Sequence, residues 1–195
     1  LEYLRGLDKR RDEIRSLIDA QEKLTDEINL ALDKAATLSE LEDIYRPYRP
    51  KRKTRASIAK EKGLEPLAND ILKQEKGFDP SKSAVDYIDE EKGVTSVEDA
   101  IQGAMDIIAE LVSDNAEIRK RIRNLTNANG VLVSVATDEE KDSVYKNYYD
   151  YKEPVKKIAG HRVLAVNRGE KEGFLKVSVE NDSEKPLNSI FRAMI

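Results

Sequence analysis

The chain has 195 residues, of which 37% are charged and 39% hydrophobic, and its formal net charge is −4. It has no cysteine, which excludes disulfides, thiolate metal sites and thiol catalysis, and no apolar run approaches the roughly 18 residues of a membrane span. Such a composition is typical of helices with narrow apolar stripes and broad solvated faces, and it leads us to expect a cytoplasmic protein without a membrane partner.

The first helices are predicted by apolar residues at helical spacing. These recur through residues 1–20 and again through residues 24–35, where Asp26 and Glu27 fall in the first turn, as the helix dipole favours. A third, short helix is predicted from Ser39-Glu-Leu-Glu42, which has the form of a capping box.

Two prolines shape the segment that follows. Pro47 is expected to stop the third helix, and together with Pro50 it predicts that residues 46–53 are extended. Further helices are predicted at residues 56–62, 66–76 and 84–88, from Thr95 or Ser96 to Leu111, and from Asp114 to Gly130. Gly63 and Gly77 are expected to end the first two of these.

Strands are predicted in the last third of the chain. Residues 131–136 and 174–179 have the composition and alternation of short strands. Between them, the tyrosines of residues 145–151 predict a helical segment, and residues 161–172 fit either a strand or a helix ended by Gly173, of which we favour the helix. We therefore expect a mainly α fold, in which a multi-helix region precedes a small β element of two or three short strands. The corresponding domains are 1–130 and a mixed α/β segment at 131–195.

Residues 45–62, here called the basic strap, carry eight Lys or Arg against one Glu, a charge of +7 in an acidic chain. The candidate nucleic-acid-binding cations are Arg46, Arg49, Lys51, Arg52, Lys53, Arg55, Lys60 and Lys62. They could contact phosphates while Tyr45 and Tyr48 stack on bases, and binding would then depend steeply on salt. In the alternative interpretation the tyrosines are structural anchors and the arginines pair with the acidic residues of 1–44.

No group of residues predicts catalysis. His161 is the single histidine, and a cap or a packed, hydrogen-bonded side chain is its expected role. The acidic runs at 89–91 and 138–140 would spread their carboxylates about 100° apart on a helix, so they do not converge on one metal ion. We expect no enzymatic activity, no metal and no cofactor.

Three long motifs occur in order along the chain. They are Leu41-Glu-Asp-Ile-Tyr-Arg-Pro-Tyr-Arg-Pro-Lys-Arg-Lys-Thr-Arg-Ala56, Ala59-Lys-Glu-Lys-Gly-Leu-Glu-Pro-Leu-Ala68 and His161-Arg-Val-Leu-Ala-Val-Asn-Arg-Gly-Glu-Lys-Glu-Gly173. Together they resemble the Tex family of bacterial transcription accessory proteins, which is related to a eukaryotic transcript-elongation factor. The resemblance covers about residues 1–180 and implies a longer protein. In that protein the N-terminal helical region seen here is followed by a ribonuclease H-like domain, helix-hairpin-helix elements and an OB-fold RNA-binding domain, none of which this chain matches.

From this resemblance we expect a helical scaffold module associated with nucleic acid, RNA or DNA, which the full-length protein would contact through phosphates. The transcription machinery is a further expected partner, and the oligomeric state is left open. The alternative is a protein–protein docking module for that machinery, in which the basic strap is purely structural. Leu187, Ile190, Phe191 and Met194 form a terminal apolar stripe, which leads us to expect a fragment whose ends face a neighbouring domain.

Overall fold

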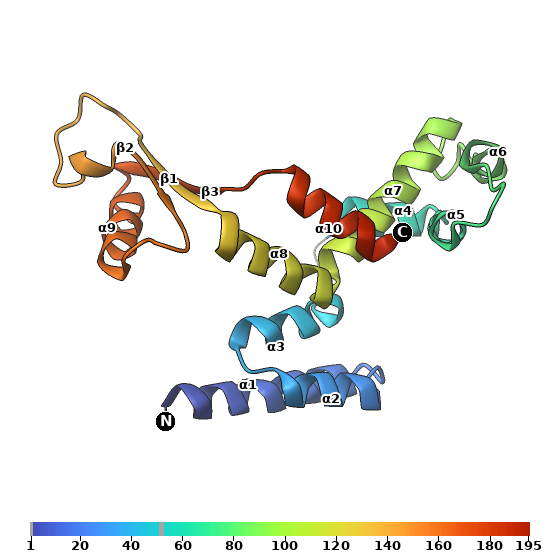
Figure 1. Ribbon diagram of the computed structural model, residues 1–195. Helices are drawn as coiled ribbons and strands as arrows, with labels where there is room; N and C mark the ends of the chain where they lie inside the picture. Colours follow the sequence, from blue (N-terminus) through green and yellow to red (C-terminus); the bar gives the residue numbers. More distant parts are fainter. Residues whose placement is uncertain (1, 51–52) are drawn as a thin grey trace. The chain divides into compact units, whose positions relative to one another are not determined.

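The computed structural model describes residues 2–50 and 53–195, in which ten α-helices and three β-strands follow one another along the chain (Figure 1). The prediction of a mainly α protein with a small β element in its last third is confirmed. The chain divides into two compact units: unit 1 is Leu1–Arg119 and unit 2 is Lys120–Ile195.

Unit 1 begins with helices α1 (Glu2–Asp19), α2 (Asp26–Lys34) and α3 (Leu38–Tyr45). Their apolar stripes meet in one core cluster, whose fully buried members include Ile14, Ile18, Leu32 and Leu41. Full burial of such a side chain contributes about 1.5–3 kcal/mol, so this cluster is what holds the three helices together.

The cap of α3 lies two residues before the predicted one. The Thr37 hydroxyl accepts a hydrogen bond from the Glu40 N–H (3.3 Å), and the Glu40 carboxylate accepts one from the Ala36 N–H (2.9 Å). The prediction of a box at Ser39–Glu42 was wrong because Ser39 already lies inside the first turn. Glu40 thus bonds to the residue before the N-cap and not to Thr37 itself, so the reciprocal pair of a capping box is not completed.

The basic strap is not extended from its start, contrary to the prediction for residues 46–53. Arg46–Tyr48 form a 3-10 turn directly after α3, and the backbone becomes extended at Arg49 (φ −67°, ψ 134°). Pro47 fits this turn because its ring fixes φ near −65° and its missing N–H falls where a first turn needs no hydrogen bond.

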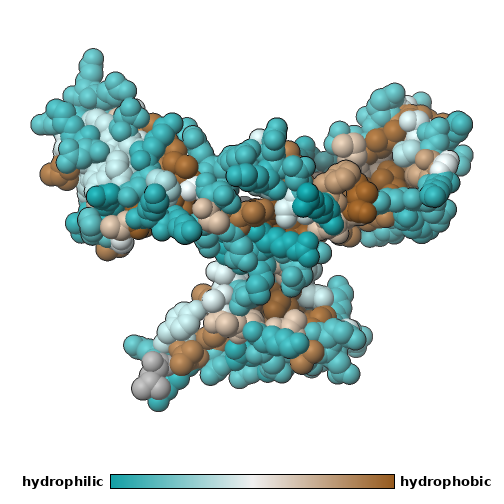
Figure 2. All heavy atoms as spheres, viewed as in Figure 1, coloured by the Kyte–Doolittle hydropathy of each residue, from teal (hydrophilic) through white to brown (hydrophobic). Residues whose placement is uncertain are grey.

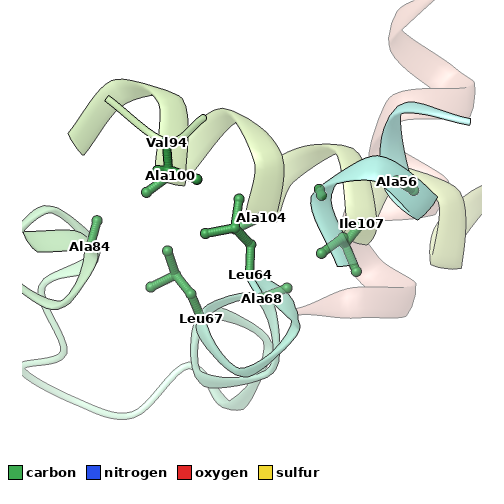
Figure 3. Packing of buried hydrophobic residues seen from close by; sticks show 10 residues of the cluster. Ala56, Leu64, Leu67, Ala68, Ala84, Val94, Ala100, Ala104 and Ile107 are labelled. Atoms are coloured by element: carbon green, nitrogen blue, oxygen red, sulfur yellow. The ribbon is translucent and has the colours of Figure 1, made fainter. Parts of the chain in front are cut away.

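Unit 1 continues with α4 (Arg55–Glu61), α5 (Glu65–Lys73), α6 (Pro80–Ala84), a 3-10 turn (Val85–Tyr87) and α7 (Val97–Asp114). A second core cluster forms here, in which Leu64 and Leu67 lie near the small side chains Ala100 and Ala104 of α7 (Figure 3). Gly103 makes this close approach possible, because a Cβ at that position would lie 2.3 Å from Leu64 Cδ1.

The helix boundaries in this region follow some of the predicted signals and depart from others. The short helix predicted at 84–88 lies earlier, because α6 ends at Ala84 and Val85–Tyr87 form a 3-10 turn, and α7 runs to Asp114 rather than to Leu111. Gly63 (φ +83°) follows the end of α4, and Ser96 rather than Thr95 caps α7 by accepting from the Asp99 N–H (3.1 Å). α5 ends earlier than predicted because Gln74 adopts the left-handed conformation (φ +52°), so Gly77 lies in the following loop.

α8 (Ala116–Asn129) leads into unit 2, whose sheet has the order β2-β1-β3. The central strand β1 (Val131–Ala136) is antiparallel to both β2 (Asp150–Pro154) and β3 (Leu175–Glu180), which confirms the two predicted strands and adds a third. α9 (Gly160–Lys171) packs on β3, as the helical interpretation of residues 161–172 predicted. The last element is α10 (Glu184–Met194).

The tyrosine-rich segment is not a helix. A 3-10 turn (Lys146–Tyr148) leads directly into β2, and the Ala136 N–H donates to the Tyr149 carbonyl (2.8 Å). Backbone groups of this segment therefore hydrogen-bond to β1, whereas in a helix they would bond to one another. Tyr145 is buried, and its ring centroid lies 5.8 Å from that of Phe174, so it belongs to the core of unit 2.

Candidate nucleic-acid interface

The two tyrosines of the basic strap are built into the body of unit 1. Tyr45 is 5% exposed, and the guanidinium carbons of Arg10 and Arg49 each lie 5.7 Å from its ring centroid. Tyr48 packs against the same core cluster, and its carbonyl accepts a hydrogen bond from the Gln21 amide (2.9 Å). This geometry favours the anchoring role over base stacking for both rings.

The first two arginines of the strap are tied to carboxylates. Arg46 Nε donates to Asp114 Oδ1 at 2.8 Å, and the Asp114 side chain is only 11% exposed. Arg49 pairs with Glu42, which also accepts from Arg10 Nε at 2.7 Å. The bond to Glu42 raises the pKa of the Arg10 guanidinium. Arg49 therefore pairs with an acidic residue of 1–44, as the alternative interpretation proposed, whereas Arg46 pairs with an acid outside that range.

A second ion pair lies at the same end of α7. Arg119 Nε, on α8, donates to Asp43 Oδ1 on α3 at 2.6 Å, and the Asp43 side chain is 6% exposed. Both pairs join distant parts of the sequence: Arg46 and Asp114 are separated by 68 positions, and Asp43 and Arg119 by 76 positions. Sequence reasoning missed these partners because no local pattern reports contacts at such separations.

The second half of the strap is exposed. The side chains of Lys53 and Arg55 are 65% and 85% exposed. Their nearest carboxylates are Glu61, 3.1 Å from Lys53 Nζ, and Asp106, 3.8 Å from Arg55 Nε. Exposed ion pairs of this kind contribute about 0–1 kcal/mol, so a phosphate can compete for both cations.

The remaining candidates extend along α4 or lie outside the described residues. Lys60 Nζ lies 3.1 Å from Glu65, and Lys62 Nζ donates to the Gly93 carbonyl at 2.6 Å. Lys51 and Arg52, both candidates for phosphate contacts, lie outside the described residues. The described part of the strap thus divides into an anchored half, Tyr45–Arg49, and an exposed half, Lys53–Lys62.

Hydrogen bonds join three ionisable groups of unit 2, Tyr151, Glu153 and Arg162. Glu153 accepts hydrogen bonds from the Tyr151 hydroxyl and from Arg162 Nη1, the latter at 2.9 Å to both carboxylate oxygens. These bonds hold the pKa of Glu153 below its usual range, whereas burial, followed by the bond to Glu153, raises the pKa of Tyr151. His161, which was expected to cap or pack, is exposed, and no described residue hydrogen-bonds its side chain.

Two further features concern the described part of the chain as a whole. None of its helices is long and apolar enough to cross a membrane, and hydrophilic side chains cover most of the face seen in Figure 2. Within residues 2–50 and 53–195, no group of three or more His, Asp or Glu side chains is placed to hold a metal ion.

Comparison with known proteins gives a family match over residues 75–195, to a model described as Tex central region-like. The match includes residues 181–195, where the resemblance had not been expected. The uncharacterized protein YdcI of Bacillus subtilis is 47% identical over 92% of this chain, and the transcriptional accessory protein Tex of Neisseria gonorrhoeae is 36% identical over 92%. The human S1 RNA-binding domain-containing protein 1 is 27% identical over 92% of the chain. The chain covers only part of the length of these relatives: 25% of YdcI, 24% of Tex and 19% of the human protein.

Proposed function

The chain belongs to the Tex family, and from this membership we propose that it is a helical scaffold module of a cytoplasmic transcription accessory protein that associates with RNA. The names of two relatives support the two parts of this proposal, one being a transcriptional accessory protein and the other an S1 RNA-binding domain-containing protein. The proposed contacts are to phosphates, which carry no sequence information.

The observation that carries the proposal is the division of the basic strap. Tyr45 and the Arg46–Asp114 pair fix its first half to unit 1, so the exposed cations Lys53 and Arg55 are presented from a defined position. Anchored presentation of this kind lowers the entropy lost when a flexible lysine or arginine meets a phosphate. A scaffold that orders its own cations in this way suits a partner with a regular array of negative charges.

The second candidate function is a protein–protein docking module for the transcription machinery. It is favoured by one observation: each described cation of the strap already contacts a carboxylate or a carbonyl oxygen. In that case the strap would be structural throughout, and partner binding would change little with salt. Neither candidate is an enzyme, and the proposal includes no cofactor, because the chain has no thiol and its one histidine has an exposed side chain.

Direct binding tests the proposal. The 195-residue chain would be titrated into labelled single-stranded RNAs of unrelated sequence, about 12 nucleotides long, at about 50 mM salt, with fluorescence anisotropy as the readout. Similar affinities for all sequences are expected. No binding to any RNA would overturn the association with nucleic acid, and strong preference for one sequence would overturn phosphate contacts as its basis.

A further inference from the structure

A groove of about 710 Å³ is lined by residues of α8 and α10 within unit 2. Its charged lining consists of Arg121 from α8 and of Lys185 and Arg192 from α10. The other lining side chains are Asn124, Leu125, Asn188 and Ser189, so none of the described residues that line it is acidic. The groove therefore combines three cations with three neutral hydrogen-bonding side chains.

The cations of the groove differ from those of the anchored half of the strap in having weak partners or none. The side chains of Arg121 and Arg192 make no ion pair or hydrogen bond with any described residue. Lys185 Nζ lies 4.0 Å from Asp182, at the limit of an ion pair, and both of these side chains are more than half exposed. A guanidinium without a protein partner keeps its full hydrogen-bonding fork for a ligand, and phosphate oxygens match that fork in a bidentate way.

The placement of α10 turns its polar face towards the groove. Lys185, Asn188, Ser189 and Arg192 follow the i, i+3, i+4, i+7 spacing of one helical face. Leu187 and Phe191 lie on another face and are 63% and 59% exposed, whereas Ile190 and Met194, the other members of the predicted apolar stripe, are half-buried.

A hydrogen bond ties the segment before α10 to α8. The Asn181 side-chain amide donates to the Thr126 hydroxyl at 2.8 Å, and Thr126 directly follows Leu125, the last groove residue of α8. Gly130 allows the two segments to approach closely because it has no Cβ. A Cβ there would lie 2.5 Å from the Thr126 carbonyl oxygen and 3.2 Å from Asn181 Oδ1. The groove is therefore fixed by a built contact at the end where α10 begins.

Charge and length indicate the kind of ligand. Unit 2 has 14 Lys or Arg against 11 Asp or Glu, a net +3, whereas unit 1 has 20 against 27, a net −7. Lys185 and Arg192 are seven residues apart, about 10 Å along the helix, which suits a series of phosphates better than one isolated anion. Leu125 is the single apolar side chain in the lining, so an acidic peptide would lack the apolar centre that protein interfaces use.

We propose that the α8–α10 groove binds the phosphodiester backbone of a single-stranded nucleic acid, with Arg121 and Arg192 as its main phosphate contacts. This inference rests on the proposed association with RNA and assigns it a site in unit 2. Asn124, Asn188 and Ser189 would donate hydrogen bonds to phosphate or sugar oxygens, which orient the strand without reading its sequence.

The test compares two double variants that remove the same number of arginines. Arg121→Ala with Arg192→Ala changes the groove, whereas Arg5→Ala with Arg168→Ala changes exposed arginines elsewhere. Binding of a labelled single-stranded RNA would be measured by anisotropy at several salt concentrations. Loss of two phosphate contacts should weaken binding roughly 25-fold at about 0.1 M salt and reduce the log–log salt slope by about 1.4. The control should match the wild type.

A second variant, Asn188→Asp with Ser189→Asp, keeps both arginines and introduces negative charge into the groove, so it should also weaken binding. Urea unfolding midpoints would verify that all variants fold. If the wild type binds RNA and the groove variants bind equally well, the assignment of the groove as the binding site is overturned, while the proposed association with RNA stands. If polyglutamate or inorganic phosphate displaces the RNA at lower concentration than unlabelled RNA does, the assignment to a nucleic-acid backbone is overturned. If the wild type binds no RNA, the proposed function and this site fail together.

Discussion

Arg119 of α8 holds its guanidinium Nε 2.6 Å from the carboxylate of Asp43 on α3, and that aspartate side chain is almost fully buried. The neighbouring Arg46–Asp114 pair has the same character, since its acid is also the buried partner. In each pair the cation is therefore the more exposed member and the carboxylate depends on it for charge compensation. Loss of the cation would leave a desolvated carboxylate with fewer partners, which costs more than loss of a surface pair.

Replacing Arg119 by alanine should accordingly lower the free energy of unfolding by about 1–3 kcal/mol. Urea denaturation followed by circular dichroism measures this change. Arg5→Ala is the matched control, because Arg5 is an exposed arginine of α1, and its effect should stay within about 0.5 kcal/mol. Equal stability of the two variants would show that the Asp43 pair contributes nothing.

Two helical glycines should respond in opposite directions to alanine. At Gly169 of α9, a Cβ would lie 2.9 Å from Leu175 Cγ and 3.1 Å from Tyr145 Cγ, so Gly169→Ala should cost about 1–3 kcal/mol by overpacking. At Gly6 of α1, nothing lies within 4 Å of the added Cβ, so Gly6→Ala should stabilise the protein by about 0.5–1 kcal/mol. Thermal or urea unfolding would distinguish the two, and a stabilising Gly169→Ala would contradict the packing described for α9.

The two halves of the basic strap should separate stability from binding. Arg46→Ala with Arg49→Ala removes two ion pairs of unit 1 and should lower stability by about 1–3 kcal/mol. Lys53→Ala with Arg55→Ala removes exposed cations, so stability should change by less than about 1 kcal/mol while RNA affinity falls for every sequence alike. Loss of stability in the second pair without loss of binding would favour the docking function instead.

Local sequence signals predicted most of the helices and strands. They could not predict which residues distant in the sequence contact one another. Periodicity located α1, α2, α7 and α9, whose stripes are set by their own sequences. It failed at residues 145–151, where Lys146–Tyr148 form a 3-10 turn and Asp150 and Tyr151 pair with β1, because tyrosine suits either conformation. For the candidate site, sequence identified the cations of the strap. It could not show that Arg46 meets Asp114 or that Arg121 faces Arg192 across a groove, since both depend on how distant helices pack.

The Tyr151–Glu153–Arg162 cluster should make stability depend on pH at both ends of the scale. The pKa of Glu153 is lowered by the hydrogen bonds from Tyr151 and Arg162, so its contribution is full above about pH 4.3 and is lost as the pH falls through the folded value. The pKa of Tyr151 is raised by burial and by Glu153, so its contribution is full below about pH 10 and is lost as the pH rises through the folded value.

Glu153→Gln should therefore reduce stability at about pH 7, and the difference from the wild type should shrink as the pH falls below about 4.3 and through the lowered pKa of Glu153. Urea midpoints across this pH range measure this difference. Glutamine was chosen because its side chain has nearly the same shape as that of glutamate. The substitution therefore removes the charge without changing the packing. A gap between the two proteins that stayed constant with pH would show that ionisation of Glu153 does not stabilise the fold.

The salt dependence of RNA binding by the wild-type chain tests the central claim, that this module meets nucleic acid through phosphates. If the two cations of a proposed site, Lys53 and Arg55 in unit 1 or Arg121 and Arg192 in unit 2, each neutralise one phosphate of a bound single strand, log K should fall linearly with log[salt] between about 50 and 200 mM. The slope should be near about −1.4 for each site. A slope near zero, or no binding at the lowest salt, would contradict the claim.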